Sequence, residues 1–127
     1  MDEKIYEFMG DLAKKSDFKS RLDRVRFVLD YNKAERVEVF DLRESEYIFG
    51  GAVIATALAD RHLEALSDAL KQALKPLGEE FLHTDASGEW IVIDMGDILA
   101  HIMTENAREK YNLEAFLDEF KKKRALR

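Results

Sequence analysis

The sequence predicts an α/β fold, with a mixed β-sheet of about five strands flanked by helices. Short runs of β-branched residues alternate with stretches whose apolar residues recur at helical spacing. Hydrophobic residues make up 46% and charged residues 36% of the 127 positions, enough for a packed core under a solvated surface. The length suits one domain over residues 1–127, with no internal repeat or linker.

Residues 1–32 are predicted to form an N-terminal helical region. A first helix is expected near residues 3–14, where apolar residues recur at helical spacing: Ile5, Phe8, Met9 and Leu12. Ser16 or Asp17 can cap a second helix. The apolar stripe of that helix is Phe18, Leu22, Val25 and Leu29. The pair could act as a structural lid or as a partner-binding face.

The next segments predict strand, strand and helix. Residues 36–42 alternate valines with charged neighbours, and residues 52–56, after Gly50-Gly51, form the continuous apolar run of a strand buried on both faces. Asp60 is expected to cap a third helix, which Pro76 and Gly78 end. Its predicted apolar face consists of Leu63, Leu66, Leu70, Ala73 and Leu77.

Three further strands are predicted at residues 79–84, 89–95 and 98–103. Met95-Gly96-Asp97 is the expected tight turn between the last two. Thr104 is expected to start a short helical turn around Arg108. Asn112 then caps a final helix with the apolar residues Leu113, Phe116, Leu117 and Phe120.

The composition excludes several classes of functional site and of targeting or membrane-spanning segment. The chain has no cysteine, which excludes disulfides, thiolate metal sites and cysteine nucleophiles. Its acidic, amphipathic start is unlike a secretory signal or a transit peptide, and no apolar run approaches the roughly 20 residues of a membrane span. A cytoplasmic protein with no membrane partner is therefore expected.

The charge is unevenly distributed along the chain. Residues 121–127 carry five positive charges, which leaves 15 Lys and Arg against 26 Asp and Glu in residues 1–120, a net charge of −11. Such a body repels phosphate and favours basic partner surfaces, so direct sequence-specific nucleic acid binding is not expected. For the basic tail two interpretations are open: a solvated, frayed terminus, or a contact to RNA.

Residues 88–116 concentrate the polar groups that point to function. Asp94, Asp97 and His101 could hold a divalent metal or perform acid-base chemistry if the last two share one face of a strand. The structural alternative is that Asp97 belongs to a Gly-Asp turn and Asp94 hydrogen-bonds the backbone there.

An interface is the other functional interpretation of this segment. Trp90 is by default a core residue. If it is partly exposed beside Arg108 and Tyr111, the three form the aromatic and arginine grouping that dominates protein interfaces. No P-loop, dinucleotide-binding, GxSxG or HExxH pattern occurs, and the three histidines lie far apart in sequence, so neither a cofactor nor a metal is expected.

Several spaced blocks in this order resemble the ribosomal silencing factor family, also called Iojap-like. The resemblance covers about residues 33–117, leaving residues 118–127 as a helix end and basic tail. Its best-matched residues are Trp90, Asp94, Gly96, Asp97, His101, Arg108, Tyr111, Leu113 and Glu114. Earlier blocks are Lys33-Ala34-Glu35 with Asp41, and residues 53–56 with Arg61. The chain departs from the family pattern at Gly50-Gly51-Ala52, His83-Thr84, Asn112 and Leu117.

The resemblance implies a non-enzymatic mechanism. Such proteins dock on the large ribosomal subunit through its ribosomal protein fourteen and sterically block joining of the small subunit, which lowers translation. It also implies a nucleotidyltransferase-like fold without metal-holding acids, and a homodimer in isolation. The expected docking residues are Trp90, Asp94, Asp97, His101, Arg108 and Tyr111, with His101 positioning the Arg108–Tyr111 turn. The alternatives are a metal-dependent nucleotidyltransferase-like enzyme that uses Asp94, Asp97 and His101, and a large-subunit assembly factor.

Overall fold

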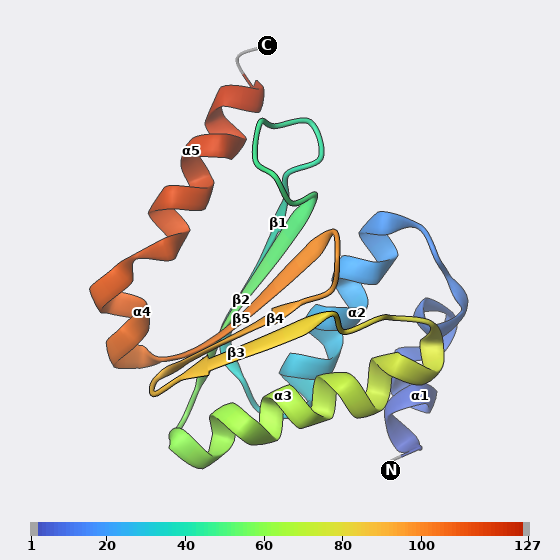
Figure 1. The fold of residues 1–127 in the computed structure, drawn as a ribbon. Coiled ribbons are helices and arrows are strands. Elements are labelled where there is room, and N and C mark those ends of the chain that lie inside the picture. Colours follow the sequence, from blue (N-terminus) through green and yellow to red (C-terminus); the bar gives the residue numbers. More distant parts are fainter. Residues whose placement is uncertain (1–2, 126–127) are drawn as a thin grey trace.

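The computed structural model, which describes residues 3–125, contains a five-stranded mixed sheet flanked by helices (Figure 1). The sheet order is β1-β2-β5-β4-β3, with β2 and β5 parallel and the other neighbours antiparallel. The strands are β1 (Glu35–Asp41), β2 (Gly51–Ala57), β3 (His83–Ser87), β4 (Trp90–Asp94) and β5 (Ile98–Thr104). The predicted fold class is thereby confirmed.

Two helical layers cover the sheet. On one face lie α1 (Lys4–Met9), α2 (Phe18–Tyr31) and α3 (Asp60–Leu74); on the other lie α4 (Glu105–Tyr111) and α5 (Leu113–Ala125) (Figure 1). The larger core lies under α1–α3 and the smaller under α4 and α5. Every residue of the inner strand β2 is buried, as its continuous apolar run predicts.

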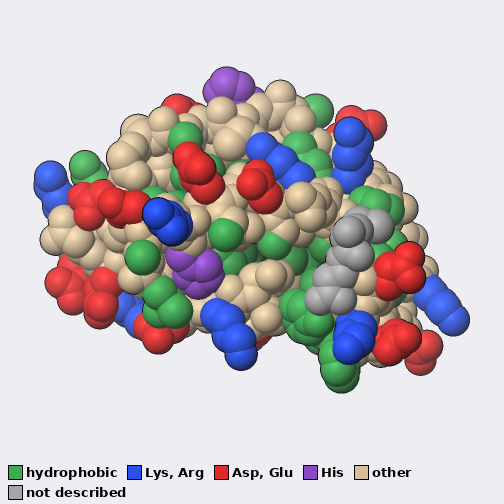
Figure 2. Space-filling model, turned by 90° about the horizontal axis from the view of Figure 1, so that it is seen from below, with side chains coloured by type: hydrophobic (Ala, Val, Ile, Leu, Met, Phe, Trp, Pro, Cys, Tyr) green, Lys and Arg blue, Asp and Glu red, His purple; other side chains and the backbone are tan. Residues whose placement is uncertain are grey.

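The N-terminal helices form largely as predicted. Asp17 caps α2 by accepting a hydrogen bond from the Ser20 amide at 3.2 Å. The predicted first helix is α-helical only to Met9, because Gly10 has φ +60°, and continues as a 3-10 helix to Lys14. Seen from below, acidic and basic side chains are spread over the whole face, with patches of hydrophobic side chains between them (Figure 2).

Two boundaries around α3 differ from the predictions. Asp60 is the first helical residue; Ala59 occupies the capping position and offers no side-chain hydrogen bond. After α3, a short 3-10 turn (Lys75–Leu77) holds Leu77, and Gly78 ends it in the left-handed conformation. Leu77 therefore lies beyond the apolar face of α3 to which it was assigned.

The strand predicted at residues 79–84 lies instead at His83–Ser87. The start of the predicted segment lies outside the sheet, because the buried Glu79 turns toward α2 and accepts two hydrogen bonds from Arg21, at 2.9 and 2.8 Å. Leu82, just before β3, already donates a backbone hydrogen bond to Asp94 of β4 at 2.9 Å. The strand itself is a largely exposed edge, so it lacks the apolar alternation on which the prediction relied.

The basic tail is partly ordered as helix. Residues 121–125 continue α5, with Lys122 and Lys123 exposed, and residues 126–127 lie outside the described part of the chain. Both interpretations of the tail stay open. Among residues 3–125, none of the helices has the length and apolar composition that crossing a bilayer requires.

Candidate functional site

The six residues singled out in the sequence divide between the two ends of the β4–β5 hairpin. Trp90 pairs with Met103 at one end, and Asp94 pairs with Leu99 at the other, next to the turn. Since α4 follows β5 directly, Arg108 and Tyr111 lie at the Trp90 end, together with His101, whereas Asp97 lies at the turn.

Three rings form a contiguous group at the first end. The Trp90 and Tyr111 ring centroids are 5.1 Å apart, and those of Trp90 and His101 are 5.8 Å apart. Trp90 is half-buried, and Tyr111 is 54% exposed. Both line a hollow of about 230 Å³ beside Lys110. The pair therefore presents aromatic surface to solvent, the condition under which an interface was expected.

His101 is the buried member of this group and holds the Trp90 ring in place. Its ring is buried and its Nδ1 accepts a hydrogen bond from Trp90 Nε1 at 3.2 Å, which places the imidazole proton on Nε2. Nε2 is buried without a hydrogen-bond partner. Burial lowers the pKa of His101 from 6.5 to about 4, so the ring is neutral at pH 7. His101 thus orients Trp90, whose ring contacts Tyr111. That His101 positions the Arg108–Tyr111 turn stays a prediction.

Arg108 is also a support, because only 1% of it is exposed. Its guanidinium bonds Glu114, the Arg36 carbonyl and, at 3.0 Å, Thr56 Oγ1, and lies 3.3 Å from a Glu38 carboxylate oxygen. These partners belong to α5, β1 and β2, so Arg108 fixes the α4–α5 corner on the sheet. The polar pairing with a partner that was expected of Arg108 is excluded by its burial.

The ion pair with Arg108 determines the charge state of Glu114. Burial raises the pKa of its carboxyl, but the Arg108 hydrogen bond and charge outweigh that effect, and the pKa lies below its ordinary value. Glu114 is therefore charged at pH 7 and forms the α5 side of the corner.

At the turn, both aspartates have partners within the chain. Asp94 accepts a hydrogen bond from the Gly96 amide at 2.8 Å, as its structural alternative predicted, and Gly96 takes φ +92°. Asp97 binds the Arg21 guanidinium of α2 through both oxygens, at 2.7 and 2.9 Å. The Arg21 hydrogen bonds lower the pKa of Asp97 below its ordinary value.

The three residues of the alternative metal site are not brought together. Asp97 turns to α2 on one side of the sheet, whereas His101 contacts Trp90 on the other. Within residues 3–125, no three His, Cys, Asp or Glu side chains are grouped so that they could hold a metal ion. The predicted common face for Asp97 and His101 is therefore wrong: Asp97 precedes β5, where strand alternation does not apply.

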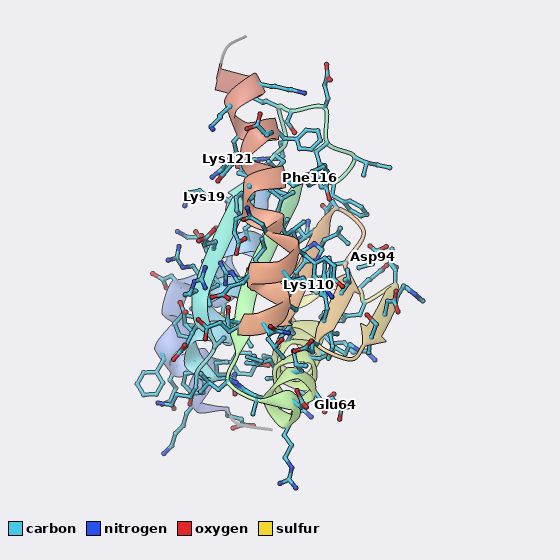
Figure 3. All side chains as sticks on the ribbon, turned by 90° about the vertical axis from the view of Figure 1, so that its left-hand side faces the viewer. Lys19, Glu64, Asp94, Lys110, Phe116 and Lys121 are labelled. Atoms are coloured by element: carbon cyan, nitrogen blue, oxygen red, sulfur yellow. The ribbon has the colours of Figure 1, made fainter. Side chains whose placement is uncertain are left out.

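Part of one sheet face is left uncovered next to the aromatic pair. Figure 3 shows α4 and α5 crossing in front of the sheet, with Asp94 to their side. On β4, Ile91 and Ile93 belong to the α1–α3 core, while the alternate residues Trp90, Val92 and Asp94 are only half-buried. We call Trp90, Val92, Leu99 and Tyr111 the open face; Leu99 shares it because it pairs with Asp94.

Sequence reasoning missed an aromatic cluster above the open face. The β1–β2 loop places Tyr47 against Phe116 and Phe120 of α5, with ring centroids 6.2 and 4.9 Å apart. Next to it, Ile48 is 87% exposed. The available signal was three consecutive apolar residues, 47–49, inside a loop that begins with charged residues and ends at Gly50-Gly51.

Comparison with known proteins places the chain in one family. The sequence model of a family described as "Ribosomal silencing factor during starvation" matches residues 15–125. A ribosomal silencing factor from Haemophilus influenzae is 35% identical over 91 residues, which cover 68% of this chain and 86% of that protein. The chloroplastic Iojap protein of Zea mays is 30% identical over 89 residues, 66% of this chain and 37% of that protein.

A crystal structure of a Chromobacterium violaceum protein shares the fold. It superposes with a TM-score of 0.76 at 24% identity, over 81% of this chain and 88% of that one. The family match extends over most of the chain and contains both ends of the β4–β5 hairpin, the α4–α5 corner and the open face. The chain is a member of the ribosomal silencing factor family.

Proposed function

We propose that this protein silences translation in the cytoplasm by docking its open face on the large ribosomal subunit, through ribosomal protein fourteen, so that the small subunit cannot join. The observation that carries the proposal is the solvent-facing Trp90–Tyr111 pair, held by the buried His101 and Arg108, in a chain of the ribosomal silencing factor family. Steric blocking requires a binding surface and no chemistry at the site.

The open face has the properties of an interface centre. Tyrosine and tryptophan supply large contact area and lose little conformational entropy when they bind. Here the Trp90 ring is already fixed by its hydrogen bond to His101, so binding costs less ordering than at a free side chain. A docking surface of ordinary size covers about 800 Å² per partner, well beyond these rings.

Electrostatics supports a basic partner. Residues 1–120 carry a net charge of −11. Asp94 lies half-buried at the edge of the open face, with one oxygen engaged by the turn, and stays in reach of a partner's cation. Opposite charge on the ribosomal protein would speed encounter and select orientation, while the aromatic pair would set the lifetime of the complex.

The experiment is co-sedimentation with isolated large subunits, small subunits and joined ribosomes. The wild type should sediment with large subunits and reduce the fraction of joined ribosomes as its concentration rises. The double variant Trp90→Ala/Tyr111→Ala should bind at least tenfold more weakly, since aromatic anchors each contribute roughly 2 kcal/mol or more. The matched control is Phe8→Ala, which removes an aromatic side chain that is 68% exposed on α1.

The proposal fails if the folded double variant binds large subunits as the wild type does. A decrease in joined ribosomes supports silencing, whereas accumulation of incomplete large subunits in cells lacking the protein supports an assembly role. The free protein is also proposed to be a homodimer, and light scattering of the purified chain tests this directly.

A further inference from the structure

The C-terminal end of α5 carries a concentration of positive charge in an otherwise acidic protein. Lys121, Lys122 and Lys123 follow one another on described helix, and no acid occurs after Glu119 in the sequence. Figure 1 shows this end of α5 extending past the sheet, beside the β1–β2 loop. The lysines therefore form a local basic projection.

The three ammonium groups are available to an external anion. Lys122 is 73% exposed at its side chain, and its ion pair with Glu119 at 3.7 Å is an exposed one that salt screens. Lys121 lies over the Phe40 ring at 5.0 Å, and Lys123 over the Phe120 ring at 5.9 Å. In both contacts the ammonium nitrogen itself lies over the ring, and the ring carries no net charge that would neutralise it.

We infer that Lys121, Lys122 and Lys123 bind the phosphate backbone of ribosomal RNA next to the docked open face. The inference rests on the proposed function and adds a second partner to it. Two lysines that lie over rings and one exposed lysine suit a polyanion, because charges spread around a helix end can each meet a phosphate without reading the sequence.

The placement allows both contacts at once. Lys121 lies on the side of α5 away from Phe116, whereas Phe116 lies on the side of α5 toward Asp94 (Figure 3). A protein partner on the open face therefore does not cover Lys121. RNA suits this end better than an acidic protein segment, because a body charge of −11 is repelled by the phosphates of the subunit, and local cations that face those phosphates offset this repulsion.

The first test is the salt dependence of large-subunit binding. Wild type and the variant Lys121→Gln/Lys122→Gln/Lys123→Gln are sedimented with large subunits at 50 and 200 mM KCl and fixed Mg²⁺. Loss of three phosphate contacts should make the slope of the logarithm of the binding constant against the logarithm of the salt concentration shallower by about 2. The ratio of the wild-type to the variant binding constant should then fall roughly 20-fold between the two concentrations. The matched control Lys14→Gln/Lys15→Gln/Lys75→Gln removes the same charge from exposed sites at the α1–α3 side.

Each outcome decides the inference. A slope equal to that of the wild type, or the same change in the control variant, overturns it. Weaker binding with an unchanged slope also overturns it, because it indicates a contact without phosphate. If the lysines only stabilise the helix end through the helix dipole, the variant melts earlier and binds normally. Failure of the wild type itself to sediment overturns the proposed function, a result the variants do not affect.

The second test identifies the contacted molecule. Because the chain has no cysteine, Lys122→Cys provides a single site for a photo-crosslinker, and Glu64→Cys on the exposed surface of α3 provides the control. On the large subunit, the label at position 122 should crosslink to RNA, and the label at position 64 should not. Crosslinking of position 122 to protein alone would overturn the inference.

Discussion

Acidification should destabilise this protein because the unfolded chain protonates His101, and the substitution His101→Gln should remove this effect. The folded-state pKa of His101 is about 4, against an ordinary value of 6.5, because the ring is buried. Between these values the unfolded chain binds a proton that the folded chain does not, so the free energy of unfolding falls as pH falls from 6.5 to 4. At pH 4.5 the loss amounts to about 2.5 kcal/mol relative to neutral pH.

The assay is urea denaturation of the wild type and of His101→Gln at pH 7.5 and pH 4.5. Glutamine keeps an acceptor for Trp90 Nε1 but does not titrate. Between pH 7.5 and pH 4.5 the wild type should therefore lose about 2.5 kcal/mol more unfolding free energy than the variant. Carboxylates titrate in both proteins and cancel from this difference. His83→Gln, at an exposed position, is the control. A difference that does not change with pH would refute the burial argument for His101.

Three further perturbations test other parts of the structure. Arg108→Met should lower the free energy of unfolding, measured by urea denaturation, by about 3 kcal/mol, because Glu114 and the Arg36 carbonyl lose their hydrogen-bond partner. A loss below about 1 kcal/mol would contradict the inference that Arg108 fixes the α4–α5 corner on the sheet. Gly51→Ala should cost about 1–2 kcal/mol in the same assay, because the new Cβ would lie 2.8 Å from Leu22 Cδ2 and 3.2 Å from Phe18; an unchanged midpoint would mean that this contact is loose. Asp97→Asn should cost less than about 1 kcal/mol, since the ion pair with Arg21 is partly exposed, and should leave large-subunit binding within twofold of wild type; a tenfold loss would restore Asp97 as a docking residue.

The sequence predicted the parts of the fold in which local pattern and tertiary context agree. Strand β2 was identified because a central parallel strand is apolar on both faces, and α2 because its stripe and Asp17 cap coincide. The boundary of β3 was missed because an exposed edge strand carries no apolar alternation, and because the partners of Glu79 lie on α2, 58 residues earlier in the case of Arg21.

The candidate site was predicted as a set of residues but not as an arrangement. Spacing alone does not separate a polar residue that faces solvent from one that is buried with internal partners, so Arg108 and His101 were given contacts that their burial excludes. The partners of Arg108 come from three elements brought together only by the sheet order β1-β2-β5. The loop aromatics were missed because their contacts to α5 span some 70 residues of sequence.

The polar residues that mark the segment in sequence therefore differ in role from the aromatic ones. Asp94, Asp97, His101 and Arg108 all have partners within the chain, whereas Trp90 and Tyr111 keep surface that no other part of the described chain covers. Substituting His101 or Arg108 should reduce stability and subunit binding together, because the aromatic pair loses its fixed position. Substituting Tyr111 should reduce binding with little effect on stability, since an exposed ring contributes little to the core. Measuring both quantities for each variant separates contact from support, and a Tyr111→Ala protein that loses stability and binding in proportion would show that the division is wrong.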